Sequence, residues 1–149
     1  MIVVAGPPGA GKTTWVNRRM RSGAGVLERD RLWMAISNEM SHTKPAGLFP
    51  LVDAAFMAVL KEMDKAAVAE QLRTVWIITG TPKKKQRQEY RDRFDAEILV
   101  FEVQPNTCLK QIMADDDRVG GLDAWSPLVH KWWREYEPDP LDTVVREKG

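Results

Sequence analysis

The chain has 149 residues and a net charge of +1, which is the size and charge of one ordinary domain. One cysteine excludes an internal disulfide and a four-cysteine zinc site, and two histidines argue against a histidine-based metal centre. No apolar run reaches the roughly 18 residues that a membrane span needs, so we expect no membrane partner. Because Met1 leads directly into an apolar stretch, we also expect a cytoplasmic protein without a cleavable signal.

Apolar periodicity and turn residues predict strands that alternate with helices. The expected strands are residues 1–5, 25–28, 73–79 and 97–103. The expected helices are residues 12–22, 30–39, 51–72, 83–93 and 106–114, and a last one from Ser126-Pro127 to just before Pro138. The alternation predicts a three-layer α/β fold whose sheet has four to five strands, mostly parallel, within residues 1–137. Residues 138–149 are expected to be a C-terminal tail, and its last residues are expected to be frayed.

The junction between the first strand and the first helix carries the most specific motif. Residues 6–13 match G-x-x-x-x-G-K-[ST], the phosphate-binding P-loop. Its glycines let the backbone approach a phosphate, and its amides and the helix N-terminus attract the anion. The sequence therefore predicts a P-loop NTPase fold that binds ATP and Mg²⁺. The predicted nucleotide-binding residues are Gly6, Pro7, Pro8, Gly9, Ala10, Gly11, Lys12, Thr13 and Thr14.

Lys12 and Thr13 have distinct predicted roles within this loop. Lys12 places a positive charge at the β- and γ-phosphates, where it would assist phosphoryl transfer. The Thr13 hydroxyl is the expected Mg²⁺ ligand. The third strand ends in Thr79-Gly80-Thr81 without a carboxylate, so the sequence offers only Thr79 or Thr81 to bind the waters of the metal there.

Asp30 is the candidate catalytic base. It follows the second strand, whose carboxyl end lies on the same edge of a parallel sheet as the P-loop. A carboxylate there can orient an acceptor hydroxyl and accept its proton. Asp30 would equally suit the N-cap of the next helix, and the two roles do not exclude each other.

Residues 6–13 and the run Leu27-Glu28-Arg29-Asp30 resemble the polynucleotide 5′-hydroxyl kinases of phages and the small phage AAA-family ATPases. The order of later elements is also similar, up to about residue 137. The resemblance implies a kinase in which Asp30 is the base, Arg29 lies near the acceptor and Arg118 binds the γ-phosphate. It also implies the host cytoplasm as the location if the chain is phage-encoded. The loop at residues 41–50, with His42 and Lys44, is placed to cover the acceptor.

Basic and acidic residues are unevenly distributed. Residues 1–93 have a surplus of Lys and Arg and residues 94–149 a surplus of Asp and Glu, which hints at an anionic partner for the first part. The basic run at residues 83–93 could follow a nucleic-acid backbone, although a solvated helix face explains it better. Arg18, Arg19 and Arg21 raise the same question, and Asp115–Asp117 read as a solvated lid rather than a metal site.

Three functions remain open at this stage. The first is a kinase that phosphorylates the 5′-hydroxyl of a nucleic acid. The second is a kinase for a small hydroxyl acceptor such as a nucleoside or nucleotide. The third is an accessory ATPase without an acceptor. The sequence identifies neither the acceptor nor the oligomeric state.

Overall fold

The structure is a computed structural model that describes residues 1–38, 44–116, 118 and 120–146. Its strands are β1 (Ile2–Ala5), β2 (Gly25–Glu28), β3 (Val75–Thr79), β4 (Glu97–Glu102) and β5 (Thr143–Arg146). Its α-helices are α1 (Lys12–Arg19), α2 (Arg29–Ser37), α3 (Phe49–Val68), α4 (Lys84–Phe94), α5 (Pro105–Met113) and α6 (Gly121–Glu135). A short 3₁₀ turn, η1 (Ala46–Leu48), precedes α3.

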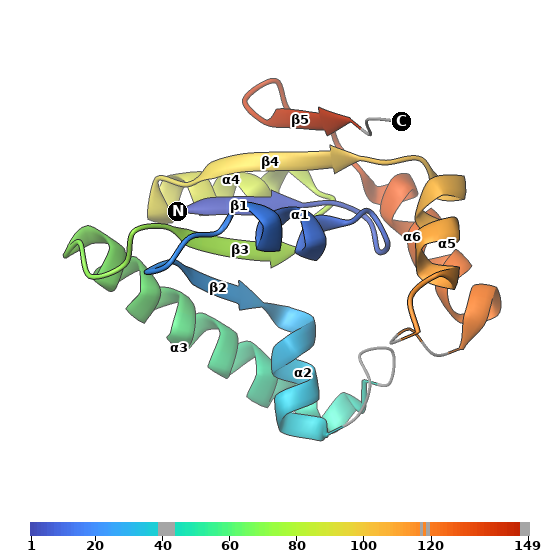
Figure 1. Cartoon of the computed structure of the whole chain (residues 1–149), viewed down its shortest axis with the longest axis horizontal. Coiled ribbons are helices and arrows are strands. Elements are labelled where there is room, and N and C mark those ends of the chain that lie inside the picture. Colours follow the sequence, from blue (N-terminus) through green and yellow to red (C-terminus); the bar gives the residue numbers. More distant parts are fainter. Residues whose placement is uncertain (39–43, 117, 119, 147–149) are drawn as a thin grey trace.

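The five strands form one parallel sheet in the order β2-β3-β1-β4-β5 (Figure 1). In the register of the central strand, Ile2 lies beside Trp76 of β3 and Glu97 of β4. The predicted α/β fold with a mostly parallel sheet is confirmed. All carboxyl ends meet at one edge, so the segments that follow β1, β2 and β3 converge there.

Helices cover both faces of the sheet, because successive strand residues point to opposite sides. Val4, Trp76 and Phe101 pack on one face with Val16 of α1 and with α5 and α6. The other face packs against α3 and α4, as Figure 1 shows. Its buried side chains include Val3, Ile77, Val100, Phe56 and Leu60. Strands buried on both sides explain the continuous apolar runs in the sequence.

The last helix begins earlier than its sequence signals indicate. Helix α6 starts at Gly121, so Ser126 is not its cap and Pro127 lies inside it. Gly120 and Gly121 have φ values of 102° and 61°, a left-handed conformation that lets the chain turn sharply into the helix. Two adjacent glycines thus override the Ser-Pro start signal.

The expected C-terminal tail is wrong for the residues that the structure describes. Strand β5 pairs in parallel with β4, with Thr143 beside Leu99 and Val145 beside Phe101. The segment before it is also fixed, because Asp139 is buried. The last part of the described chain is therefore an integral edge of the sheet.

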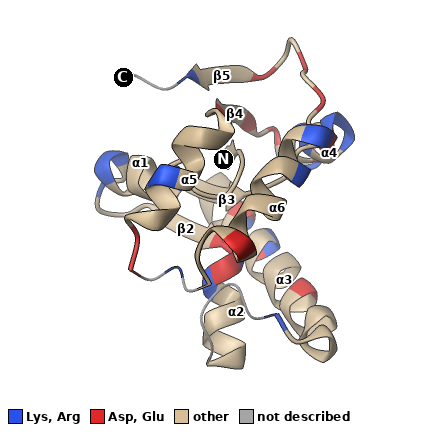
Figure 2. Cartoon of the chain, turned by 90° about the vertical axis from the view of Figure 1, so that its right-hand side faces the viewer, with Lys and Arg blue, Asp and Glu red and all other residues tan. Residues whose placement is uncertain are grey.

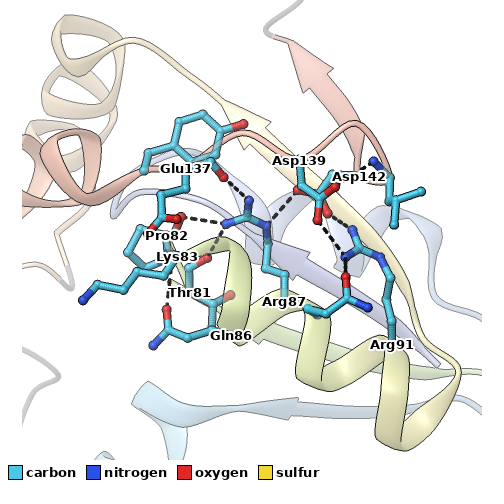
Figure 3. Close-up of polar contacts among 12 residues, drawn as sticks. Thr81, Pro82, Lys83, Gln86, Arg87, Arg91, Glu137, Asp139 and Asp142 are labelled. Carbon is cyan, nitrogen blue, oxygen red and sulfur yellow. Dashed lines mark hydrogen bonds and ion pairs between the residues drawn. The ribbon is translucent and has the colours of Figure 1, made fainter.

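Arg87 of α4 fixes this segment, and it is completely buried. Its guanidinium donates to Asp142 Oδ2 at 2.8 Å and to the carbonyl oxygens of Thr81, Pro82 and Glu137 (Figure 3). One buried cation thereby joins the end of β3 to the chain that leads into β5.

Arg91 lies one helical turn further along α4 and pairs with both acids of the same segment. It contacts Asp139 Oδ2 at 3.1 Å and also Asp142 Oδ1 (Figure 3). The expectation of a solvated face for the basic run is therefore wrong for Arg87 and Arg91. Their charges are neutralised inside the fold.

Candidate active site

The P-loop closes tightly over the first turn of α1. Gly9 has φ 79°, and a Cβ at this position would lie 2.5 Å from the Cys108 carbonyl oxygen and 2.7 Å from Ile112 Cγ1. Helix α5 therefore packs directly on the loop backbone, and only glycine fits there. Cys108 is buried at this contact.

The Lys12 ammonium folds back over the loop. Its Nζ donates to the carbonyl oxygens of Gly6 at 2.6 Å and Pro7 at 2.8 Å. Burial lowers the pKa of Lys12 to about 8, the charge of Asp30 opposes this shift and the charge of Arg118 adds to it. A phosphate in the loop would give this ammonium the counter-charge that two neutral carbonyl groups do not.

Thr13 faces a carboxylate that the sequence analysis overlooked. Its hydroxyl donates to Glu28 Oε1 at 2.9 Å, across the gap between α1 and the end of β2. Glu28 Oε2 is buried and accepts no hydrogen bond, although Arg31 Nε lies 3.2 Å away in an ion pair. A hydroxyl and a carboxylate with a spare oxygen are hard donors that suit Mg²⁺, so these two residues fit the metal that a P-loop implies.

Asp30 lies in the first turn of α2, at the edge where the P-loop opens. The N-cap of α2 is Glu28, so the alternative that Asp30 is the cap is wrong. Lys44 Nζ donates to Asp30 Oδ1 at 3.0 Å and thereby fixes one oxygen of the carboxylate. Asp30, predicted as the catalytic base, and Lys44, predicted to bind the acceptor, are therefore in direct contact.

Arg29 points toward α3, and it is not held in a position to bind a phosphate directly. Its guanidinium pairs with Asp53 and lies 5.2 Å from the ring centre of Phe56. The structure thus brings Arg29 to the wall of the site. There its charge is already balanced.

Arg118 lies in the connection between α5 and α6. Its guanidinium carbon is 4.7 Å from the centre of the Trp125 ring, and its Nε lies 3.3 Å from Asp115 Oδ2. It is close enough to Lys12 to lower the pKa of that lysine. The aromatic ring supports the arginine from behind, which suits a side chain that closes over a phosphate. Asp117 and His42 lie outside the described residues.

One groove of about 1700 Å³ connects these groups along the carboxyl edge of the sheet. All predicted nucleotide-binding, catalytic and acceptor-binding residues line it except Pro7, whose carbonyl oxygen binds Lys12. Of the two threonines that could bind the waters of the metal, Thr79 lines the groove and Thr81 does not. Figure 2 looks onto this edge, with α2, α5 and α6 around it. The volume exceeds the roughly 300–1000 Å³ of a pocket for a single ligand, which leaves room for a nucleotide and an acceptor together.

No group of three or more His, Cys, Asp or Glu side chains in the described part of the chain could hold a metal ion. A helix long and apolar enough to span a membrane is likewise absent from the described ranges.

Comparison with known proteins assigns a family. Residues 1–117 match the profile of a family described as AAA domain. The chain belongs to this family. Together with the P-loop, this match confirms the prediction of a P-loop kinase or ATPase. The comparison of the AAA domain with curated protein sequences gives no match.

Three solved structures similar to this chain are named as kinases. A sugar kinase from Janibacter sp. HTCC2649 has a TM-score of 0.61 at 17% identity, with 98% of this chain and 83% of the other covered. A gluconokinase from Sinorhizobium meliloti 1021 has a TM-score of 0.55 at 17% identity, and the match covers 97% of this chain and 81% of the gluconokinase. A shikimate kinase from Bacteroides thetaiotaomicron has a TM-score of 0.55 at 19% identity, and the match covers 90% of this chain and 77% of the shikimate kinase. At these identities the likeness establishes the fold.

Proposed function

We propose that this AAA domain transfers the γ-phosphate of ATP to a hydroxyl of a small molecule. One observation carries the proposal. Two carboxylates from the β2–α2 junction, Glu28 and Asp30, lie in one groove with the P-loop lysine. One carboxylate pairs with the metal-binding hydroxyl and the other is available to an acceptor, which is the division of work that phosphoryl transfer requires.

The phosphate side of the groove would work mainly through charge. The loop amides and Lys12 would hold the β- and γ-phosphates. Thr13 and Glu28 would hold Mg²⁺, which when bound supplies positive charge to the phosphate oxygens. Arg118 would place a second cation on the transferring group, supported by Trp125. Since the transferring group carries spread negative charge, these cations stabilise the transition state more than the ground state.

The acceptor side would be organised by Asp30. Its free carboxylate oxygen would accept a hydrogen bond from the acceptor hydroxyl and then its proton as the new phosphate ester forms. Lys44 holds the other oxygen of Asp30, so the carboxylate enters the reaction already oriented. Arg29, fixed by Asp53, would form the wall against which the acceptor rests.

A small acceptor fits the structure better than a polynucleotide. The basic run that could have followed a nucleic-acid backbone contributes Arg87 and Arg91 to an internal ion-pair network. Three of the similar solved structures are named as a gluconokinase, a shikimate kinase and a sugar kinase. The 5′-hydroxyl of a nucleic acid, which the resemblance to phage kinases favours, stays the competing acceptor.

A transfer assay with labelled γ-phosphate tests the proposal. The acceptor panel should contain sugars, hydroxy acids, nucleosides and a 5′-hydroxyl oligonucleotide. Transfer to a small acceptor is expected, and Asp30→Asn should slow it about 100-fold or more while ATP binding is retained. Glu97→Gln is the matched control, because Glu97 is exposed at the amino end of β4.

Three results would change the conclusion. Undiminished transfer by the Asp30→Asn variant would remove Asp30 from the reaction. Transfer to the oligonucleotide alone would restore the polynucleotide acceptor. Hydrolysis of ATP without transfer to any member of the panel would favour the accessory ATPase.

A further inference from the structure

A second concave site lies at the opposite end of α1 from the P-loop opening. It is a pocket of about 390 Å³, lined by Arg19, Arg21, Ala24, Arg73, Thr74 and Trp76. These residues come from the end of α1, the turn into β2 and the start of β3. We call this the arginine pocket. The mechanism proposed above uses none of its residues, although Arg19 also lines the P-loop groove.

The charges of the arginine pocket are not neutralised within the described part of the chain. No described carboxylate forms an ion pair with Arg19, Arg21 or Arg73. Six other arginines are paired with acids, and these are Arg29, Arg31, Arg87, Arg91, Arg118 and Arg146. Arg18, Arg93 and Arg134 also lack an ion pair within the described residues, but none of them lines this pocket. The pocket is therefore distinguished by three such arginines around one concave site.

Three guanidinium groups around so small a pocket repel one another. A sphere of this volume is roughly 9 Å across, which is close to the Debye length of about 8 Å at physiological salt. Solvent ions therefore screen the repulsion only in part. A bound anion would relieve it and would receive several N–H donors at once.

One residue that lines the pocket has a buried donor without a partner. Trp76 lines the pocket and is 7% exposed, and its indole Nε1 makes no hydrogen bond in the described structure. It is the only buried side-chain nitrogen of the described residues in this state. Buried donors are nearly always satisfied, so an unsatisfied one beside three unpaired arginines points to a ligand with acceptor oxygens.

The arrangement also limits the kind of anion. Guanidinium groups match the oxygens of phosphate in a bidentate manner, and three of them suit an anion with more than one negative charge. The pocket volume lies at the low end of the range for small-molecule sites. We propose that the arginine pocket binds a small phosphate-bearing anion, separately from the nucleotide in the P-loop groove.

Calorimetric titration with inorganic pyrophosphate tests this site directly. The intact chain should show two classes of site, and Lys12→Ala should weaken only the one in the P-loop. In the Lys12→Ala chain, Arg21→Gln or Arg73→Gln should weaken the remaining site about tenfold each, the effect of losing one charge-assisted hydrogen bond. Trp76→Phe, which keeps the ring and removes the N–H, should weaken it as well.

Arg134→Gln is the matched control, because Arg134 is exposed on α6 and lines neither the groove nor the pocket. Thermal unfolding of every variant verifies that it folds, and Arg73→Lys preserves the charge if the glutamine variant does not fold. The proposal is wrong if pyrophosphate occupies a single site, or if Arg134→Gln weakens binding as much as the pocket variants. Binding of an oligonucleotide without binding of pyrophosphate would also overturn it.

Discussion

Nucleotide binding to the AAA domain should be accompanied by proton uptake on Lys12 at alkaline pH. Burial lowers the pKa of Lys12 from 10.5 to about 8 in the structure. A triphosphate beside the ammonium favours the charged form and should return the pKa to about its ordinary value. The nucleotide-bound protein then holds the proton on Lys12 more tightly than the free protein does. Binding must therefore take up protons at pH values between the two pKa values of Lys12.

The expected amount follows from the two pKa values. At pH 9 the free protein would hold about 0.1 proton on Lys12 and the complex nearly one, so binding should take up about 0.9 proton. At pH 7 Lys12 is already about 90% protonated, and its contribution falls to about 0.1 proton. The affinity should correspondingly fall by up to about tenfold for each pH unit above 8.

Isothermal titration in two buffers of different ionisation enthalpy measures this uptake. The comparison belongs at pH 9, where the terminal phosphate of the nucleotide is fully ionised and releases no proton. Lys12→Arg is the control, because a guanidinium stays charged and cannot take up a proton. Uptake below about 0.3 proton at pH 9, or equal uptake by Lys12→Arg, would refute the burial argument.

Three further changes test other parts of the structure. Glu28→Gln should raise the Mg²⁺ concentration needed for half-maximal transfer about tenfold or more, because an anionic ligand is lost; an unchanged requirement would exclude Glu28 from the metal site. Asp142→Asn leaves the charge of Arg87 buried without its acid, and it should lower the free energy of unfolding by about 3–5 kcal/mol, or the melting temperature by roughly 10–15 °C. Glu62→Gln removes the acid of an exposed ion pair and is the control, and a loss by Asp142→Asn no larger than that of the control would contradict this. Gly9→Ala should abolish nucleotide binding, measured by calorimetry, because its Cβ collides with α5; normal affinity would show that the loop can move aside.

The elements next to the P-loop were predictable because their signals are local. The strand, the glycines and the helix start of the loop lie within about ten residues, and β2 ends at Glu28 as the sequence predicts. The metal-binding role proposed for Glu28 was nevertheless not predicted, because the carboxylate of such a site was expected at the end of β3. Its signal was available, since Glu28 and Asp30 both follow a strand whose carboxyl end faces the P-loop.

The fixed C-terminal segment could not be predicted in the same way. The acids that neutralise Arg87 and Arg91 lie 48–55 residues further along the chain. No local pattern distinguishes a lysine- and arginine-rich helix that faces solvent from one whose guanidinium groups are buried. The distinction depends on tertiary pairing.

The buried Arg87 also has a consequence for the order of events during synthesis. Its guanidinium requires the Glu137 carbonyl oxygen and the Asp142 carboxylate, which are translated 50 and 55 residues later. Until that stretch has left the ribosome, α4 cannot settle against the sheet without leaving a cation unpaired in an apolar layer. Parts of the fold that do not contact this stretch, such as the P-loop, can therefore form before α4 packs against the sheet.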